Sequence, residues 1–246
     1  MCTVSWALGA NGYHLLCNRD EKRSRARATP PCVRTESNLQ VIAPRDPVGG
    51  GTWIASNSRG ISVALLNGCN LGEEDGGPSH MSANESRGRL PARLIRFGTV
   101  EATRDALEAM RLAAFLPFTV LILAPGEPAH LFAWNGREKR ILTDDSAHGL
   151  VCSSSHDPQG VRRYRHAAFD SLRRQAKSVN PDLLFWFHES HGKSPGAYST
   201  CMHRPDAETV SFSWIRVDSA EVEFFYTPSS PCRWLPGTTR RAPRME

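Results

Sequence analysis

The chain has 246 residues, of which 40 % are hydrophobic and 22 % are charged. This composition is ordinary for a globular protein, so it excludes a disordered, collagen-like or coiled-coil chain. The 30 Lys and Arg residues against 25 Asp and Glu give a formal charge of +5, which is too weak to predict nucleic-acid binding without clustered charge.

Strand patterns dominate the first part of the chain. Apolar and polar residues alternate from the second residue onward, and segments rich in Gly and Asn provide the turns of two predicted hairpins. The strands predicted here are 2–8, 13–18, 52–56 and 61–67. Between the hairpins, residues 19–51 are polar and rich in Arg and Pro, so we expect a long loop there.

Helical spacing of apolar residues appears in the middle of the chain and strand patterns return after it. The predicted helices are 90–97, 100–115 and 158–177. The further predicted strands are 118–123, 129–134, 140–143, 150–153, 199–203, 209–217 and 222–226. Blocks of strands joined by turns indicate antiparallel sheets covered by helices, an α+β domain over residues 1–235. Residues 236–246 are predicted to be a flexible basic tail.

Membrane and targeting signals are missing from the sequence. The longest apolar run, 113–125, is interrupted by Pro117 and falls short of the roughly 20 residues that a spanning helix needs. The N-terminus lacks the features of a secretory signal. Seven cysteines without a Cys-x-x-Cys pair favour reduced thiols over a disulfide framework. We therefore expect a cytoplasmic protein without a transmembrane segment, and the sequence leaves the oligomeric state open.

Cys2 is the most informative residue for function. Methionine aminopeptidases remove Met1 when the next side chain is small, which would leave a free α-amine beside the Cys2 thiol. The reference pKa values are about 7.7–8.0 for such an amine and about 8.5 for a thiol. The amine can therefore take the thiol proton directly or through one water molecule. The alternative is that Cys2 is an ordinary buried strand residue.

Charged residues follow the second predicted strand, in the sequence Asn18-Arg19-Asp20-Glu21. If the first hairpin forms, this segment lies beside the chain start. A carboxylate there can hold the α-ammonium group, and an arginine can lower the pKa of the thiol. The alternative is a solvated, charged loop.

Two other segments contain groups that could bind a substrate. Three glycines at 49–51 precede Thr52 and could expose N–H groups to a ligand. Asn67 ends an apolar strand, where its amide could donate to an oxyanion. Alternatively, the glycines only provide an unusual backbone conformation and Asn67 is a turn residue.

Metal and haem signals are weak. His188 and His191 are spaced i, i+3, whereas a zinc-protease helix needs i, i+4, and Gly192 and Pro195 indicate a surface loop rather than a helix. We therefore predict no metal site. No Cys-x-x-Cys-His sequence for covalent haem attachment occurs. A non-covalent haem could use a His or Cys as axial ligand, without one residue being singled out.

Several of these motifs together resemble one known family. The motifs are Cys2, Asn18-Arg19-Asp20-Glu21, Gly49-Gly50-Gly51-Thr52-Trp53, Asn57-x-x-Gly60, Leu65-Leu66-Asn67-Gly68 and Cys201-Met202-His203-Arg204 followed by Thr209-Val210-Ser211. This combination resembles the NRDE family, also called the transport and Golgi organisation protein 2 family, from Cys2 to about Tyr226. That family is in turn similar to the N-terminal nucleophile hydrolases that cleave bile-salt and penicillin V amides. The resemblance implies a four-layer αββα sandwich.

The resemblance also implies roles for individual residues. Cys2 would be the nucleophile, Arg19 and Asp20 its polar supports, and Asn67 an oxyanion donor. The residues expected at the substrate are Asn18, Gly50, Gly51, Thr52, Ser154 and Arg204. The sequence departs from the amidases in two respects: Arg19 and Asp20 are adjacent, where the amidases separate Arg and Asp by two residues, and the segment corresponding to a further amidase Asn is 152–155, which contains none.

Two functions therefore stand as expectations. The first is an N-terminal-cysteine hydrolase acting on the amide or ester bond of a small acyl substrate, with no required cofactor. The second is a non-catalytic binding or trafficking protein on the same scaffold, taking haem, acyl-CoA or another hydrophobic carboxylate. Links of the family to haem mobilisation and lipid metabolism imply this second function.

Overall fold

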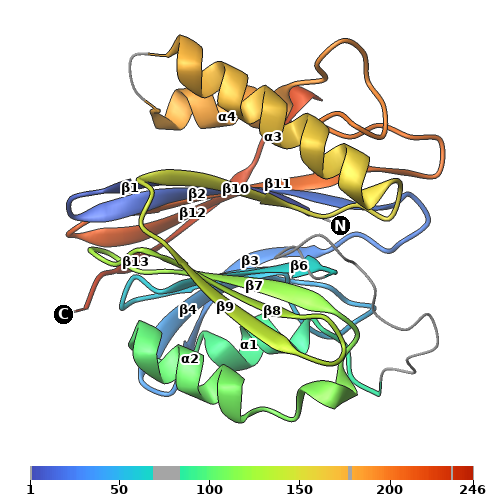
Figure 1. Ribbon diagram of the computed structural model, residues 1–246. Coiled ribbons are helices and arrows are strands. Elements are labelled where there is room, and N and C mark those ends of the chain that lie inside the picture. The colour runs from blue at the N-terminus through green and yellow to red at the C-terminus, as the bar shows by residue number, and fades with distance from the viewer. Residues whose placement is uncertain (1, 69–83, 177–178, 234, 246) are drawn as a thin grey trace.

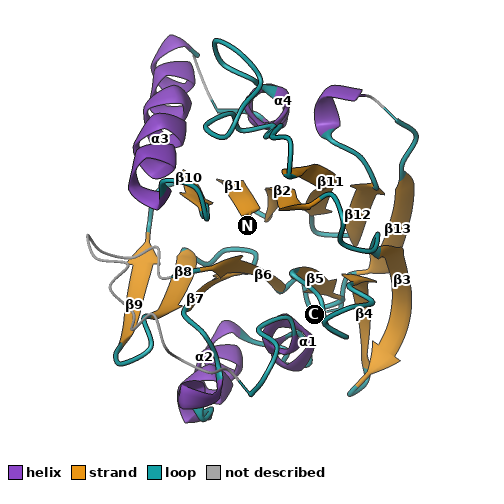
Figure 2. Cartoon of the chain, turned by 90° about the vertical axis from the view of Figure 1, so that its right-hand side faces the viewer, coloured by secondary structure: helices purple, strands orange, loops and turns teal. Residues whose placement is uncertain are grey.

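Two antiparallel sheets lie face to face in the computed structural model, which describes residues 2–68, 84–176, 179–233 and 235–245. Helices cover the outer face of each sheet (Figure 1). The view turned by 90° shows the four layers in succession, helices, sheet, sheet and helices (Figure 2). The expected αββα sandwich of antiparallel sheets is therefore confirmed.

The strands are divided between the sheets in an order that brings both halves of the chain together. In the described residues, the first sheet consists of β10 (His148–Cys152), β1 (Cys2–Gly9), β2 (Gly12–Lys22), β11 (Ala207–Val217), β12 (Glu221–Thr227) and β13 (Thr238–Pro243), in that order. The second consists of β3 (Thr29–Glu36), β4 (Leu39–Arg45), β5 (Ile54–Asn57), β6 (Ser62–Asn67), β7 (Phe118–Leu123), β8 (Ala129–Trp134) and β9 (Lys139–Asp144). The N-terminal strand thus lies between β10 and β2.

The helices pack against the sheets as two pairs. Their bounds are Arg89–Leu94 for α1, Val100–Ala109 for α2, Pro158–Gln175 for α3 and Pro181–Glu189 for α4, with short 3-10 turns η1 (Leu112–Ala114) and η2 (Pro231–Arg233). The surface loop expected at 187–191, from the nearby Gly192 and Pro195, is wrong for its first three residues, which form the last turn of α4; the helix ends before both Gly192 and Pro195. Its start is capped by the Asn180 side chain, which accepts from Leu183 N. In the described part of the chain, no helix combines the length and apolar character needed to cross a bilayer.

Three apolar clusters fill the spaces between the four layers. The cluster between the sheets includes Val4, Leu15 and Cys17, whereas Leu16 belongs to the cluster between the first sheet and helices α3 and α4. Side chains of a strand alternate between its two faces. Odd-numbered residues of β2 therefore point between the sheets, and even-numbered ones point toward the helices.

The expected loop over 19–51 is wrong for most of its length. Strand β2 continues to Lys22, and β3 and β4 form a hairpin whose two turn residues, Ser37 and Asn38, have φ values of 50° and 63°. Two-residue hairpin turns of this kind need positive φ. Two of the four prolines of this segment, Pro30 and Pro31, lie in β3. This strand is at the edge of its sheet and shifts register there, the position where a sheet tolerates proline.

The predictions for the C-terminal region also need correction. Residues 238–243, expected within a flexible tail, form β13, which pairs with β12 and buries Ala242 completely. Residues 199–203, expected as a strand, contain only a single bridge at His203. The sequence of β13 gave no strand signal because most of its side chains are exposed, so it lacks the apolar alternation of a half-buried strand.

Placing a charge at the buried position of β13 should destabilise the protein. Ala242→Asp is expected to lower the free energy of unfolding by several kcal/mol, because an unpaired carboxylate would enter the core between the sheets. The matched control is Thr239→Asp, which adds the same charge to an exposed position of the same strand. Urea denaturation of both variants tests this. Equal free energies of unfolding for the two variants would mean that β13 is frayed from the sheet and that Ala242 is not buried.

Candidate active site

Cys2 opens the first strand at one end of the space between the sheets. The antiparallel register places Arg19 of β2 directly opposite Cys2, so both side chains lie on the inner face of the sheet. They border a cleft of about 240 Å³. The described residues that line it are Cys2, Arg19, Glu21, Arg25, Asp46, Thr52, Trp53, Leu65, Asn67, Glu85, Ser86, Arg87, Gly88 and Leu116. The structure thus brings together four of the expected residues: Cys2, Arg19, Thr52 and Asn67.

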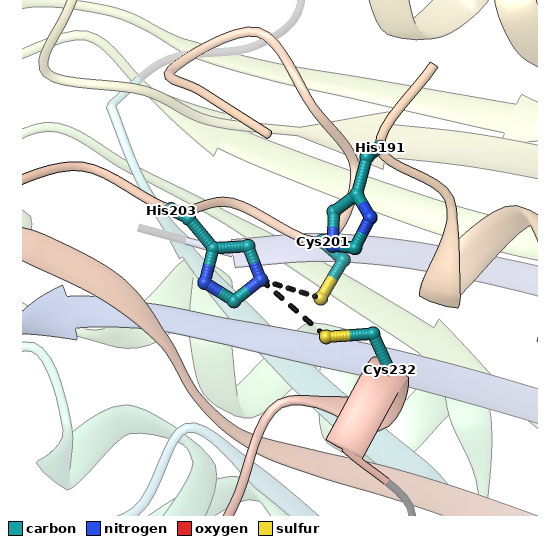
Figure 3. A group of neighbouring side chains, drawn as sticks. All are labelled: His191, Cys201, His203 and Cys232. Atoms are coloured by element: carbon teal, nitrogen blue, oxygen red, sulfur yellow. Dashed lines mark hydrogen bonds between the residues drawn. The ribbon is translucent and has the colours of Figure 1, made fainter. Parts of the chain in front are cut away.

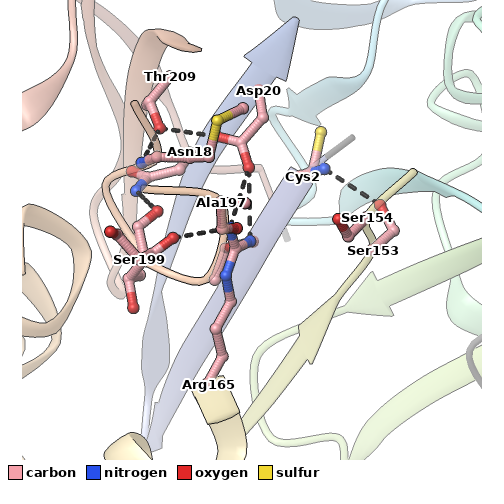
Figure 4. A network of polar contacts seen from close by, with 12 residues as sticks. Cys2, Asn18, Asp20, Ser153, Ser154, Arg165, Ala197, Ser199 and Thr209 are labelled. Atoms are coloured by element: carbon pink, nitrogen blue, oxygen red, sulfur yellow. Dashed lines mark hydrogen bonds and ion pairs between the residues drawn. The ribbon is translucent and has the colours of Figure 1, made fainter. Parts of the chain in front are cut away.

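The main chain of Cys2 is held by the residue that follows β10. The Cys2 nitrogen donates to Ser153 Oγ at 3.1 Å, and Ser153 N donates to the Cys2 carbonyl at 2.9 Å (Figure 4). Ser154, the residue expected at the substrate, instead donates its hydroxyl to the carbonyl of His156. No local motif distinguishes these two serines, because only the pairing of β1 with β10 places Ser153 beside Cys2.

The surroundings of the Cys2 thiol favour its thiolate form. A hydrogen bond from the Cys17 side chain lowers the pKa of Cys2 and burial raises it. The charge of the chain's amino terminus lowers the pKa, the Asp20 carboxylate raises it, and the Arg19 guanidinium makes the smallest contribution, which lowers it. The net direction is downward. The same hydrogen bond, together with burial, raises the pKa of Cys17. Cys17 therefore remains a thiol that donates to Cys2, a role that the sequence analysis did not assign.

Arg19 is fixed at the cleft by an aromatic ring and two carboxylates. Its guanidinium carbon lies 4.3 Å from the centroid of the Trp53 ring, a cation–π contact. Its Nη2 is 3.7 Å from Asp46 and 3.9 Å from Glu21. Arg19 is thus a buried positive charge in the same cleft as the thiol.

Asp20 points away from this cleft, toward the helices. Its carboxylate accepts from Thr209 Oγ1 at 2.7 Å and lies 3.4 Å from the guanidinium of Arg165 in α3 (Figure 4). Burial raises the pKa of Asp20, while Arg165 and Thr209 counteract that rise. Because β2 alternates, the adjacent Arg19 and Asp20 serve opposite faces of the sheet. Asp20 was expected to support the Cys2 thiol from within the cleft, but it is not among the residues that line the cleft.

Arg165 is the central residue of a polar network that the sequence analysis missed. The side chain is 1 % exposed, and besides Asp20 it donates to Thr3 Oγ1 and to the Ser199 carbonyl at 2.7 Å. A usable signal existed: Val161, Arg165 and Phe169 recur at four-residue intervals and are the buried residues of α3. An arginine inside the apolar stripe of a helix indicates a buried partner.

The other predicted substrate residues have structural partners. Asn18 is fully buried and donates to the carbonyls of His188 and Thr200 at 2.8 and 2.9 Å, on the helix side of the sheet. Arg204 forms an ion pair with Asp206 at 2.7 Å and is not among the lining residues of the cleft. The structure therefore does not bring Asn18 and Arg204 to Cys2.

The glycine segment shapes the cleft wall rather than lining it. Gly50 has a φ of 68° and donates its N–H to the Asp46 carbonyl at 2.9 Å. A Cβ on Gly51 would lie 2.2 Å from the Gly88 backbone, so this position requires glycine. The close approach lets Thr52 N donate to the Gly88 carbonyl at 2.9 Å, which fixes the segment carrying Arg87 against the cleft.

The cleft contains guanidinium and carboxylate groups but, among its described lining residues, no histidine. Thr52 and Ser86 contribute hydroxyl groups and Cys2 a thiol. The thiol is the strongest potential nucleophile of these, because Cys17 and Arg19 lower its pKa. The amide of Asn67 and the ring of Trp53 complete a polar pocket that could hold a carbonyl compound beside the sulfur. This arrangement suits acyl transfer to a thiolate.

Comparisons with known proteins address the family and the fold. The sequence model of the family described as "Transport and Golgi organisation 2" matches residues 1–185. A search of curated protein sequences finds no match.

Three solved structures show the likeness of fold. A mutant of conjugated bile acid hydrolase from Clostridium perfringens has a TM-score of 0.57 at 10% identity, over 99% of this chain and 92% of that chain. For penicillin V acylase from Agrobacterium tumefaciens the TM-score is 0.57 at 11% identity, over 97% and 84%. The N-acylethanolamine-hydrolyzing acid amidase ortholog of Caenorhabditis elegans gives 0.61 at 11% identity, over 87% and 92%. At these identities the likeness establishes the N-terminal nucleophile hydrolase fold and not an activity.

Removing the Arg165 guanidinium should destabilise the protein in a pH-dependent way. Arg165→Met is expected to lower the free energy of unfolding by about 3–5 kcal/mol at neutral pH, because Asp20 then stays buried without a partner. Without the guanidinium the pKa of Asp20 rises further, so acidification protonates this residue and reduces the difference from wild type. Denaturation at pH 7 and pH 5 measures both effects, with the exposed Arg163→Met of the same helix as control. A difference that grows on acidification would contradict the assignment.

Removing the thiol donor beside Cys2 should shift its reactivity. Cys17→Ala is expected to raise the pKa of Cys2, so that alkylation of Cys2 by iodoacetamide moves to higher pH. Cys17→Ser keeps an O–H donor and should stay close to wild type. Peptide mass mapping across a pH series measures the Cys2 rate separately from the other cysteines. Coincident profiles for Cys17→Ala and wild type would exclude this role of Cys17.

Proposed function

The chain belongs to the transport and Golgi organisation 2 family, and from the geometry around its first strand we propose that it is an N-terminal-cysteine hydrolase. Its nucleophile is Cys2, exposed as the first residue by removal of Met1. Its substrate is a small acyl compound with an amide or ester bond. The observation that carries the proposal is that the main-chain nitrogen and the thiol of Cys2 lie together at a polar cleft whose residues favour the thiolate.

The first half of the reaction transfers the acyl group to sulfur. The α-amine of Cys2, oriented by Ser153, takes the thiol proton, and the sulfur attacks the carbonyl carbon of the substrate. The negative charge on the carbonyl oxygen is stabilised by the Asn67 amide. The carbon–nitrogen or carbon–oxygen bond then breaks, the protonated amine gives its proton to the leaving group, and a thioester of Cys2 remains.

The second half restores the thiol. The α-amine takes a proton from a water molecule while the oxygen of this water attacks the thioester carbonyl. The carbon–sulfur bond breaks, the sulfur recovers a proton from the ammonium group, and the free acid leaves. Arg19 holds a positive charge beside the sulfur in both halves and stabilises each thiolate that forms. No cofactor is needed for this sequence of steps.

The lining of the cleft suggests the kind of substrate. Arg19, Arg25 and Arg87 supply guanidinium groups and Trp53 an aromatic face. Asp46 and Glu21 of the same cleft pair with Arg19 and Arg25. Arg87 is therefore the guanidinium that we propose to contact a carboxylate or another polar anionic group of an acyl amide. The solved structures of similar fold are named for hydrolysis of conjugated bile acids, penicillin V and N-acylethanolamines. We extend only the bond type, an acyl bond to nitrogen, to this chain.

One observation favours the alternative of a binding or trafficking protein. Asp20 is held by Arg165 and Thr209 on the helix side of the sheet and is not among the lining residues of the cleft, whereas the amidase resemblance implies a carboxylate at the thiol. On this alternative, the guanidinium groups of the cleft hold the carboxylates of haem or the phosphates of acyl-CoA, and Cys2 is not consumed in a reaction.

The nucleophile can be tested by changing Cys2 or by blocking its amine. Cys2→Ala, or an N-terminal extension that remains attached before Cys2, is expected to abolish hydrolysis of a panel containing penicillin V, a conjugated bile acid and an N-acylethanolamine. Cys32→Ala, at an exposed cysteine of β3, should retain full activity. Intact mass should show the loss of Met1 and a transient acyl adduct on Cys2.

If the protein instead binds haem or acyl-CoA without catalysis, different results are expected. Spectral titration with hemin and equilibrium binding of acyl-CoA would then show saturable binding that Cys2→Ala retains, without turnover of any amide. Turnover that survives both the Cys2→Ala change and the N-terminal extension would contradict the proposed mechanism.

A further inference from the structure

We propose that His191, Cys201, His203 and Cys232 bind a zinc ion, which fastens the segment 190–204 above the first sheet. One ligand atom from each of the four side chains can be chosen such that all lie within 4.8 Å of one another. The two sulfurs and the two imidazole rings face a common centre (Figure 3). This group lies apart from the Cys2 cleft and has no role in the proposed hydrolysis.

Two of the distances between ligand atoms of the group match those of a tetrahedral zinc site. Zinc binds sulfur at about 2.3 Å and nitrogen at about 2.0–2.1 Å, which holds a sulfur and a nitrogen about 3.6 Å apart in a tetrahedron. The Sγ atoms of Cys201 and Cys232 lie 3.5 and 3.4 Å from His203 Nε2. The His191 and His203 rings have centroids 5.0 Å apart. Side chains already at these separations need little movement to close around the ion.

The surroundings of the two histidines support ligation. Nδ1 of His203, the nitrogen opposite the sulfurs, lies 4.0 Å from a carboxylate oxygen of Glu208. Histidine ligands of metals commonly turn their second nitrogen toward a carboxylate in this way. Nε2 of His191 is buried without a hydrogen-bond partner among the described residues. A metal ion would give this nitrogen a partner.

The donor set selects the metal. Two thiolates and two imidazoles are a common ligand set of structural zinc, whereas magnesium and calcium prefer oxygen ligands. All four positions of the tetrahedron would be filled by protein, which indicates a structural ion rather than a catalytic one. This proposal departs from the expectation of no metal site, which was based on the spacing of His188 and His191. His188 itself is buried elsewhere, with its ring against Ser5 Oγ at 2.8 Å.

The consequence for the protein follows from what the ligands are attached to. They come from three segments: the residue pair after α4, the 196–204 loop and the turn η2. The residues just before Cys201 provide the Ser199 carbonyl that accepts from Arg165 and the Thr200 carbonyl that accepts from Asn18. An ion that fixes Cys201 and His203 therefore also fixes the acceptors of the buried network around Asp20.

Metal content of the full-length protein purified under reducing conditions tests the proposal. We expect about one zinc ion per chain, and cobalt substitution should give the visible absorption of a tetrahedral site with sulfur-to-cobalt charge transfer. The variants Cys232→Ser and His191→Gln should each lose the bound zinc, because each removes one ligand. Their cobalt-treated forms should also lose the absorption of a tetrahedral site. Cys32→Ser, at an exposed cysteine outside the group, should keep both.

Hydrogen exchange supplies a readout independent of the metal assay. Removal of zinc by a chelator should increase amide exchange over 196–204 and leave the helices α1 and α2, on the opposite side of the molecule, unchanged. Each of three results would overturn the proposal. The reduced wild-type protein could bind neither zinc nor cobalt, or the Cys232→Ser protein could bind both as the wild type does. The third result is a Cys201–Cys232 disulfide that persists in the presence of a reducing agent.

Discussion

The buried ion pair between Arg165 and Asp20 is the interaction on which the arrangement around the N-terminal strand depends. Both side chains are almost completely excluded from solvent, so each charge requires the other. Through Arg165 the pair connects helix α3 with Thr3 of β1 and with the Ser199 carbonyl. The position of Cys2 depends on this network, because Cys2 is the first residue of the strand that the network holds in place.

The four residues Asn18 to Glu21 have separate tasks because a strand alternates. Asn18 and Asp20 face the helices and fasten the outer layer, while Arg19 and Glu21 face the cleft. A motif read as one catalytic unit is therefore divided between packing and chemistry. This division explains why adjacent Arg and Asp residues can both be important even though they do not meet at the thiol.

The sequence pattern was sufficient for most strands and for antiparallel sheets covered by helices, while the four layers and the grouping of Cys2, Arg19 and Asn67 were implied by the family resemblance. Apolar alternation and helical spacing can be recognised within a single segment of the sequence. The pairing of two neighbouring strands follows from the short turn between them, so Arg19 could be placed beside Cys2. The β3 and β13 strands escaped because their exposed, Arg- and Pro-containing sequences have no apolar period.

Residues positioned by distant pairing also escaped. Ser153 reaches Cys2 only through the pairing of β1 with β10. Cys17 lies on the neighbouring strand β2, so the hairpin register could have indicated it, but its effect on the pKa of Cys2 has no sequence motif. The four metal-binding side chains that we propose come from segments up to 41 residues apart in sequence, from His191 to Cys232, without a recognisable spacing. Arg165 could have been found, because its place in the apolar stripe of α3 is visible in the sequence.

The position of β1 between β2 and β10 has a consequence for biosynthesis. During translation β1 can form a hairpin with β2 at once, but Ser153, the acceptor for the Cys2 nitrogen, emerges about 150 residues later. At about 5–20 residues per second, the N-terminus stays without that partner for on the order of 10 s. For the removal of Met1 that we propose, an aminopeptidase working at the ribosome would meet an open chain end, before β10 pairs with β1 and Ser153 reaches the Cys2 nitrogen.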